Sequence, residues 1–165
     1  MISKEEFFLE TKRNIQNIGL EIASIDFERP WGGFFVINEK DNQKFIQEFF
    51  ADTIKIDWSI NQKISPKILI VAPKKKLSWQ YHHRRSEIWK LIQGEAGIIK
   101  SKTDEEGVLE RLVINKAIEL KQEERHRLVG LNEWGMVAEI WVHTDAQNPS
   151  DEDDIVRISD EYGRE

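Results

Sequence analysis

The segment at residues 77–94 constrains this chain more than any other, because it places Gln80, His82 and Glu87 close together before a glycine, Gly94. Imidazole nitrogens and carboxylate oxygens are ligands of first-row divalent metal ions. In an extended strand alternate side chains point to the same face, so Gln80 and His82 can reach one point. Glu87 begins the next apolar run after a short corner and can return to that point. The spacing predicts a metal site inside a β-sheet.

A further ligand is expected from a distant strand. The chain has four histidines, and His126 lies at residues 124–128, before another apolar run. In a regular strand His83 points to the opposite face from His82, so we do not expect it to bind the metal. We expect His143 to be a strand-end residue. The predicted ligands are Gln80, His82, Glu87 and His126.

These residues resemble the first cupin motif, a His-x-His followed by Glu and then Gly, with Gln80 where the first His usually stands. The flanking pattern, Leu-Ser-x-Gln-x-His-His and then Arg-x-Glu-x-Trp, is similar to the cupin domain of type II mannose-6-phosphate isomerases. Arg85 falls on the motif arginine of that family. The resemblance spans roughly residues 29–143 and implies the same four ligands: Gln80, His82, Glu87 and His126.

Other segments extend this resemblance or depart from it. Lys67 matches a lysine on the strand before the motif, and residues 29–32 (Arg-Pro-Trp-Gly) resemble the segment that opens the domain. The second cupin motif, normally Pro-x-Gly-x-x-His, is degraded here to Lys-Gln-Glu-Glu-Arg-His at residues 121–126. The family's third consecutive His is Arg84, and the His after the Glu is Ile88. Neither change removes a ligand.

The resemblance implies a metal-dependent aldose–ketose isomerase acting on a sugar or a sugar phosphate. A divalent ion can polarise a sugar carbonyl or hydroxyl, and the isomerisation also needs a base that moves a proton between C1 and C2. Arg85 and Lys67 are the expected catalytic residues, since either can bind a phosphate or stabilise an enediolate. For Arg85 the alternative is a surface salt bridge. No residue of the sequence identifies itself as the base.

The resemblance also implies one divalent ion per chain, with zinc expected first and manganese, iron, cobalt or nickel as alternatives. Two other function classes stay open. One is a non-catalytic sugar-binding or regulatory cupin, which the loss of the Pro-x-Gly turn favours. The other is an oxygen-using cupin metalloenzyme, which would need iron and redox chemistry. The nucleotidyltransferase domain of longer relatives is absent from this sequence, so we do not expect sugar-nucleotide synthesis.

Composition excludes several other classes of protein. The 165 residues are 39% hydrophobic and 33% charged, which is typical of one soluble domain. The absence of cysteine excludes disulfides and thiolate ligands and suits a reducing cytoplasm. The net charge of -6 argues against a nucleic-acid partner. No signal peptide and no apolar run near the roughly 18 residues of a membrane span are present. Because cupins often pair, we expect a homodimer.

From residue 66 onward short apolar runs alternate with turn residues roughly every 8 to 12 positions, as in a jelly roll. We therefore expect an all-β fold, a single cupin jelly-roll barrel with an N-terminal helix and a short helical insert. Residues 1–28 form the N-terminal helix and strand that pack on the barrel, and residues 29–146 form the barrel. Residues 147–165 form an acidic tail, either solvated or lightly docked. Residues 41–62 have no counterpart in the family.

The N-terminal helix is expected at residues 3–18, where Ser3 and Glu6 form a capping box and Gly19 follows as a stop. It either packs on the outside of the barrel or helps to build a dimer. Asp41 is expected to cap the insert helix, whose Phe45 and Phe49 share one face. Strands are expected at 21–28, 34–37, 67–71, 78–82, 87–92 (turning at Gly94), 96–100, 108–114, 125–129 and 137–142.

Two further segments have two interpretations each. Residues 29–33 break regular structure, because proline fixes φ and two glycines free the chain. The segment is either a plain turn with Trp31 as a hydrophobic plug, or part of the pocket rim through Arg29 or Trp31. The three lysines at 74–76 form either a solvated turn or a site that attracts a sugar phosphate.

Overall fold

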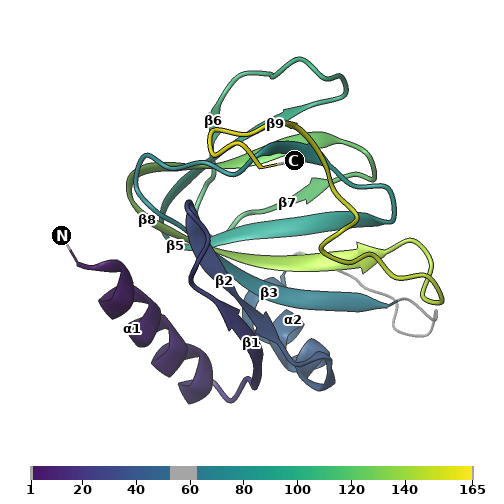
Figure 1. The fold of residues 1–165 in the computed structure, drawn as a ribbon. Coiled ribbons are helices and arrows are strands. Elements are labelled where there is room, and N and C mark those ends of the chain that lie inside the picture. Colours follow the sequence, from purple (N-terminus) through teal and green to yellow (C-terminus); the bar gives the residue numbers. More distant parts are fainter. Residues whose placement is uncertain (1, 53–62, 165) are drawn as a thin grey trace.

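The computed structural model describes residues 2–52 and 63–164 and is drawn in Figure 1. The segment around Trp58 lies outside the described residues. The elements, in chain order, are α1 (Lys4–Asn17), β1 (Ile22–Asp26), β2 (Gly32–Ile37), the 3-10 helix η1 (Glu39–Asp41), α2 (Asn42–Phe50), β3 (Ile64–Val71), β4 (Trp79–Tyr81), β5 (Arg85–Ser101), β6 (Glu110–Arg111), β7 (Ala117–Leu120), β8 (Arg125–His143) and β9 (Val156–Ser159).

The strands within the described residues form one antiparallel set in the order β1-β2-β3-β8-β4-β9, and β5 joins it by pairing with β8, β6 and β7. The two long strands, β5 and β8, pair from Arg85↔His143 to Ser101↔Arg125. Bulges at residues 91–93 and 94–96 of β5 interrupt this register, and bulges bend a strand. The bent pair therefore contributes to both walls of the barrel.

The strand prediction was wrong at 108–114, where only Glu110–Arg111 (β6) forms a strand, and at Gly94. The sequence placed a turn there, but β5 continues through it, with Gly94 at φ +74° in a bulge. A Cβ at this position would lie 1.8 Å from the Trp134 backbone oxygen, so only glycine fits so close to β8. Likewise, the two strands expected at 125–129 and 137–142 are halves of the single strand β8.

Both faces of the central strands are covered, and their side chains alternate between two cores. On β3, Ile68 and Ile70 belong to an outer core under the helices, whereas Leu69 and Val71 belong to an inner core within the barrel. This double coverage explains why β3 is a continuous apolar run rather than an alternating one. On β8, Val137 faces the inner core, and Met136, Ala138 and Ile140 face the outer one.

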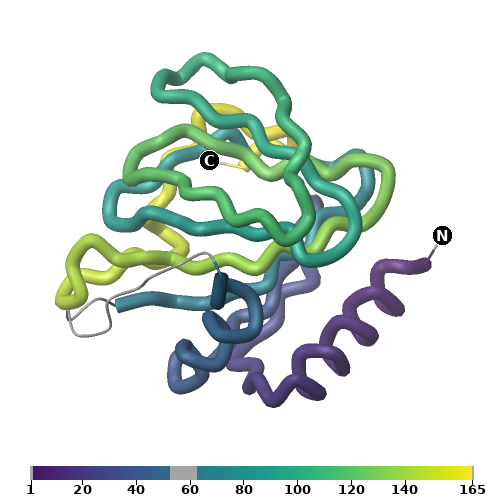
Figure 2. The backbone as a smooth tube through the Cα atoms, turned by 180° about the vertical axis from the view of Figure 1, so that it is seen from behind, coloured from purple at the N-terminus to yellow at the C-terminus, as the bar shows by residue number. Residues whose placement is uncertain are grey.

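The helices lie on one side of the barrel, as Figure 2 shows from behind. The capping box of α1 is confirmed: Glu6 N–H donates to Ser3 Oγ, and Ser3 N–H donates to the Glu6 carboxylate. Phe8 of α1 is fully buried and packs 5.4 Å from Phe35, measured between ring centres. The helix therefore packs on the outside of the barrel, as expected. Neither α-helix in the described part of the chain is long and apolar enough to cross a membrane.

The insert helix is confirmed at α2, but its expected cap is wrong. Asp41 stands at the N-cap position without a side-chain hydrogen bond to the helix. Its carboxylate accepts instead from Glu21 N–H at 2.8 Å, and so ties the insert to the start of β1. Phe45 is fully buried, and its ring centre lies 4.9 Å from that of Phe49, as expected for a core face.

The C-terminal segment, which we call the strap and define as residues 144–164, crosses the barrel in yellow in Figure 1. Its strand β9 pairs with β4 through Gln80↔Arg157 and Tyr81↔Val156. Ser150 and Asp154 are buried. Of the two states that the sequence left open for this acidic segment, the docked one is present.

Candidate metal site

Three side chains converge inside the barrel. His82 follows β4, Glu87 lies on β5, and His126 lies on β8, where it pairs with Gln80. The three are buried, and their potential ligand atoms all lie within 4.8 Å of one another. Glu87 Oε1 is 3.4 Å from His82 Nε2, and Glu87 Oε2 is 3.4 Å from His126 Nε2. The structure thus brings together the two histidines and the glutamate that the spacing predicted as ligands.

Backbone carbonyls fix the orientation of both rings. His82 Nδ1 lies 2.6 Å from the Asp154 carbonyl oxygen, and His126 Nδ1 lies 2.8 Å from the Glu124 carbonyl oxygen. Because a carbonyl only accepts, each Nδ1 carries the proton and donates it. In a neutral imidazole the lone pair is then on Nε2, the atom that faces Glu87. Hydrogen bonds of this kind orient metal-binding histidines and increase their basicity.

These residues fit a divalent metal ion. His126 Nε2 is buried without a hydrogen-bond partner among the described residues. A buried acceptor left unpaired costs about 1–3 kcal/mol, and a cation between the facing acceptors would remove that cost. Two nitrogen ligands of one tetrahedral zinc ion lie about 3.4 Å apart, so the widest pair, at up to 4.8 Å, has to close by up to about 1.4 Å. The triad could therefore hold a metal ion.

Burial and the Arg85 guanidinium set the charge states of His82 and Glu87. It lowers the pKa of His82 to about 3, against the opposing effect of the Glu87 carboxylate. Burial alone would raise the pKa of Glu87, but the Arg85 guanidinium holds it well below its usual range. At neutral pH His82 is therefore a neutral imidazole and Glu87 a carboxylate. Metal binding requires these protonation states.

Arg85 lies in the site itself and not on the surface. Its exposed fraction is 6%, so the alternative of a surface salt bridge is wrong. Its Nε donates to Glu87 Oε1 at 2.9 Å, and its Nη2 donates to His82 Nε2 at 3.1 Å. The guanidinium carbon lies 3.5 Å from the centre of the Trp141 ring. A catalytic role for Arg85 stays a prediction.

Gln80 and His83 lie on the opposite faces that the strand alternation predicted. Gln80 lines the same cavity as His82, and its Oε1 accepts from Ser78 Oγ at 2.8 Å. Its role as fourth ligand stays a prediction. His83 points away, with about half of its side chain exposed. His143 is the last residue of β8, as expected for a strand-end residue.

Glu139 is a buried acid in this site that sequence reasoning missed. Its carboxylate accepts from Trp89 Nε1 at 2.7 Å and from Trp141 Nε1 at 2.9 Å. Trp89 Nε1 also lies 3.1 Å from Glu87 Oε2, so one indole bridges the two acids. Burial and the nearby Glu87 carboxylate raise the pKa of Glu139 to about 8. The sequence signal was a single acid in the apolar run at residues 135–142.

Lys67 lies beside Glu139 on the adjacent strand. The two residues are directly paired between β3 and β8, and Glu139 is in turn paired with Trp89 of β5. Lys67 is buried, and its Nζ lies 3.8 Å from the centre of the Trp141 ring. The three side chains therefore form one row across three strands, on rigid elements rather than loops.

The strap orients the metal-facing side of the site. The Asp154 carbonyl holds the His82 ring, and the Asp154 carboxylate accepts from the backbone N–H groups of His83 at 3.1 Å and Arg84 at 2.9 Å. Ser150 Oγ donates to the same carboxylate at 2.6 Å. Burial alone would raise the pKa of Asp154, but these hydrogen bonds lower it.

The strap also contacts both predicted catalytic cations. Arg85 Nη1 donates to Ser150 Oγ at 2.9 Å and to the Asp151 carbonyl at 3.2 Å. Lys67 Nζ donates to Glu152 Oε1. The segment to which the sequence assigned no chemistry therefore contacts His82, Arg85 and Lys67.

These groups line a cavity of about 70 Å³. One water needs about 10–15 Å³ on the same measure, so the space suits an ion with a few waters or a small polar group. Arg29 and Trp31 both line it, and Trp31 is also part of the inner core. Both interpretations of the segment at residues 29–33 therefore hold. Residues 74–76 do not belong to the lining.

The degraded second cupin motif keeps its turn. Glu123, at the position of the motif glycine, has φ +64°, in the left-handed region that glycine adopts without strain. Glu124 N–H donates to the Lys121 carbonyl at 3.0 Å and closes the turn. His126 is thus positioned by a turn of the same kind, at the cost of some backbone strain.

A family model for the mannose-6-phosphate isomerase C-terminal domain matches residues 50–160. No curated protein matched the chain. Among solved structures, vicilin from Solanum lycopersicum (tomato) is similar with a TM-score of 0.54 and 15% identity over 85% of this chain and 36% of that one. KdgF from Halomonas sp. is similar with a TM-score of 0.51 and 12% identity over 79% of this chain and 91% of that one.

The capsular polysaccharide assembling protein CapF from Staphylococcus aureus is also similar, with a TM-score of 0.51 and 14% identity over 84% of this chain and 34% of that one. This chain spans about a third of the length of vicilin and of CapF. At these identities the similarity shows the fold alone, which is that of a cupin.

Proposed function

Because this chain belongs to the family of mannose-6-phosphate isomerase C-terminal domains, we propose that it is a metal-dependent aldose–ketose isomerase acting on a sugar or a sugar phosphate. The observation that carries the proposal is the arrangement of His82, Glu87 and His126. Both rings donate through Nδ1 to backbone carbonyls and direct Nε2 toward one carboxylate, beside a cavity that contains further charged groups. We propose that the ion is zinc and that Gln80 assists as the fourth ligand.

A divalent ion in this site would act as a Lewis acid and polarise the carbonyl or hydroxyl of the sugar. The site also contains groups for the other requirements of the reaction. Arg85 can donate two parallel hydrogen bonds to an enediolate oxygen or a phosphate, although in the structure its donors are directed at Glu87 and His82. Lys67 supplies a second fixed positive charge on β3.

Glu139 is our candidate for the base that moves the proton between C1 and C2. It lines the cavity, it is held in place by two indole N–H groups, and its raised pKa of about 8 lies near a neutral working pH. A proton carrier is most effective when its pKa matches the working pH. The sequence alone offered no residue for this role.

The alternative of a non-catalytic cupin was favoured by the loss of the Pro-x-Gly turn. That argument weakens, because Glu123 adopts a left-handed backbone conformation, which glycine favours, and His126 still reaches the site. The oxygen-using alternative requires bound iron and oxygen consumption, and it is tested in the same experiment. We further propose that the protein is a homodimer, which sedimentation would test.

The test is a panel of aldoses, ketoses and their phosphates, incubated anaerobically with the protein after reconstitution with zinc, manganese, iron, cobalt or nickel. We expect interconversion of one aldose–ketose pair, with mannose 6-phosphate as the first substrate to test. Arg85→Lys keeps the charge but loses the planar fork, and it should lower turnover roughly ten-fold, or about 1.4 kcal/mol. If no sugar isomerises with any metal, the proposed activity is wrong. Turnover that requires oxygen and iron would favour the oxygen-using alternative.

A further inference from the structure

The inner cavity borders a larger outer groove at Glu152. The groove measures about 670 Å³ and is lined by residues 24–29 together with Phe34, Val36 and Glu152. Arg29, Phe34 and Glu152 line both spaces. Glu152 comes from the strap, whereas Phe34 lies on β2. The Glu152 side chain therefore stands on the boundary between the groove and the cavity that contains the candidate metal site.

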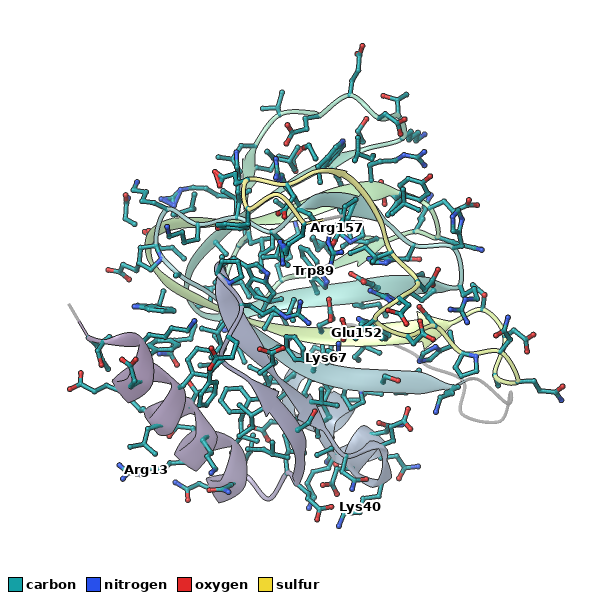
Figure 3. All side chains as sticks on the ribbon, in the orientation of Figure 1. Arg13, Lys40, Lys67, Trp89, Glu152 and Arg157 are labelled. Carbon is teal, nitrogen blue, oxygen red and sulfur yellow. The ribbon has the colours of Figure 1, made fainter. Side chains whose placement is uncertain are left out.

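Lys67 holds Glu152 in this position, and Figure 3 shows the two labelled side chains next to each other below the crossing strap. The Lys67 side chain is 6% exposed and the Glu152 side chain 57% exposed. Lys67 Nζ also lies 4.6 Å from the centre of the Phe34 ring and 3.8 Å from that of Trp141. The ammonium is thus fixed on a strand among aromatic rings, whereas the carboxylate is largely in water.

This difference in burial decides which partner can leave. Burying an ammonium costs several kcal/mol unless an anion compensates it, so the position beside Lys67 favours a negative charge. The Glu152 carboxylate can rotate into water at little cost, because it is already more than half exposed. Any other anion that reaches Lys67 can then take its place.

Three other cations of the cavity wall have acidic partners other than Glu152. Arg29 pairs with Asp26 at 3.0 Å, and Arg164 pairs with Asp160 at 2.8 Å, both within their own segments of chain. Arg85 pairs with Glu87 inside the site. The Arg29–Asp26 pair lies on the groove side of the same boundary, whereas the Lys67–Glu152 pair links the barrel wall to the strap across it.

We propose that Lys67 is the centre of an anion-binding subsite, and that the Glu152 carboxylate occupies this subsite until a ligand displaces it. The ligand is a small molecule with a phosphate or carboxylate group, which enters along the groove, exchanges with Glu152 and joins the groove to the inner cavity. The inference rests on the proposed function only in taking the cavity as the ligand site. It adds that the Glu152 carboxylate competes with an anionic ligand for Lys67 and that the strap thereby controls the entry of the ligand.

The test measures binding rather than turnover. Mannose 6-phosphate, mannuronate and mannose are titrated by calorimetry into the protein as purified, with its metal content measured. Three variants accompany the wild type. Glu152→Gln removes the competing carboxylate, Lys67→Met removes the ammonium, and Asp153→Asn removes one exposed acid from the same turn as a control with matched net charge.

We expect Glu152→Gln to bind an anionic sugar roughly tenfold tighter than the wild type, a gain of about 1.4 kcal/mol. Asp153→Asn should stay within about twofold of the wild type, and Lys67→Met should lose most of the affinity. Whichever of mannose 6-phosphate and mannuronate gains more identifies the anionic group. Mannose should bind equally to all four proteins. The anion should also raise the melting temperature of Glu152→Gln more than that of the wild type.

Two results would overturn the inference. Equal affinities for Glu152→Gln and Asp153→Asn would mean that Glu152 does not occupy the subsite, as would happen if Lys67 turned to Glu139 across the sheet. Undiminished binding by Lys67→Met would place the anion elsewhere, for instance on the metal. Because no turnover is measured, a protein that isomerises no sugar can still support the anion subsite, and an active isomerase can still refute it.

Discussion

Arg85 Nη2 lies 3.1 Å from His82 Nε2, the ring atom that faces the candidate metal site. Through Nε the same guanidinium donates to Glu87 at 2.9 Å, so one fixed positive charge binds two of the three converging residues. A divalent ion and Arg85 therefore compete for the same lone pairs, and the two cations also repel each other.

Replacing Arg85 by Met should therefore raise the affinity for zinc by roughly tenfold while it destabilises the metal-free protein. The metal-free protein loses stability because Glu87 is left as a buried charge without its cationic partner, which typically costs about 3–5 kcal/mol. Zinc titrations and thermal melts with and without zinc measure both effects. Arg84→Met, at a neighbouring arginine that hydrogen-bonds the strap instead, is the control. Unchanged or weaker zinc binding by Arg85→Met would show that Arg85 does not compete with the ion.

The histidines provide a direct test of the ligand set. His82→Ala and His126→Ala should each lower the affinity for a divalent ion by about tenfold to a hundredfold or more, whereas His83→Ala should bind almost as the wild type does. Only the first two rings direct Nε2 toward Glu87; His83 is half exposed on the other face. Metal content after dialysis and calorimetric titration measure the difference. Equal losses at all three positions would be incompatible with this ligand set.

Glu139 should make the metal-free protein less stable as the pH rises. Its folded pKa of about 8 lies above that of an ordinary glutamate, so between about pH 4.5 and 8 the folded state keeps a proton that the unfolded chain releases. The free energy of unfolding should then fall with pH across this window, by at most about 1.4 kcal/mol per pH unit. Below the window the effect disappears. Above about pH 8 both states are ionised, and the loss is complete.

Glu139→Gln should flatten this part of the profile, as measured by urea unfolding at a series of pH values. The overall stability should fall, because the two indoles donate to different oxygens of Glu139 and the amide replaces one of these oxygens by an NH2 donor. Glu119→Gln, at an exposed position on β7, is the control and should keep the wild-type slope. If the free energy of unfolding of Glu139→Gln still falls with pH as in the wild type, the pH dependence does not come from Glu139.

Asp154 should couple the strap to the metal site. Asp154→Asn removes the charge that accepts from two backbone N–H groups and Ser150, which should cost about 2 kcal/mol, or roughly 4–8 °C in melting temperature. These hydrogen bonds lower the pKa of Asp154 in the folded state. The contribution of Asp154 to the free energy of unfolding is therefore complete above about pH 4 and is lost as the pH falls through the folded pKa.

The same variant should weaken zinc binding, since the Asp154 carbonyl orients His82. Asp153→Asn changes the net charge equally from an exposed position and should alter neither property. A variant that loses stability but keeps full zinc affinity would show that the strap is only structural.

Glu123→Gly should stabilise the protein. A non-glycine residue in the left-handed region costs about 1–2 kcal/mol, and the exposed contact between Glu123 and His83 contributes about 0–1 kcal/mol. The greater freedom of glycine in the unfolded chain offsets part of the gain. We expect a net gain of about 0.5–1 kcal/mol, seen as a rise of about 2 °C in melting temperature. Glu123→Ala also removes the carboxylate but keeps Cβ, so it should show no gain.

The sequence predicted the barrel and the inward side chains well where the pattern was local. The capping box of α1 and the alternation through Gln80, His82 and His83 depend on backbone geometry within a few residues, and both are confirmed. The convergence of Glu87 and His126 depends on long-range pairing, and the spacing together with the resemblance was sufficient to predict it.

The continuity of β5 through Gly94 and of β8 through residues 130–136 was harder to predict. A glycine in an apolar run indicates either a turn or a bulge, and only the pairing of Gly94 with Gly135 shows that it is a bulge. Glu139 was missed for a related reason. One acid in a strand is usually solvent-facing, and Glu139 is buried because helices cover one face of β8 and the barrel closes over the other.

The role of the strap could not be read from residues 147–165, because an acidic, weakly periodic segment looks the same whether docked or free. Its docking depends on partners far away in the chain, such as the N–H groups that follow β4 and the buried Lys67. These partners become recognisable only when the barrel has closed.

The pairing of β9 with β4 also sets the order in which this molecule can be assembled during synthesis. β4 carries Gln80 and leads directly into His82, and its outer edge is completed by residues 156–159, more than seventy positions further along the chain. A chain emerging from a ribosome can form the helices and much of the β3–β8 wall first, but His82 has no Asp154 carbonyl to orient it until the strap has emerged as well. Metal capture is therefore expected to be a late event in biogenesis, and a nascent chain stalled before residue 150 should bind zinc poorly even when its barrel has closed.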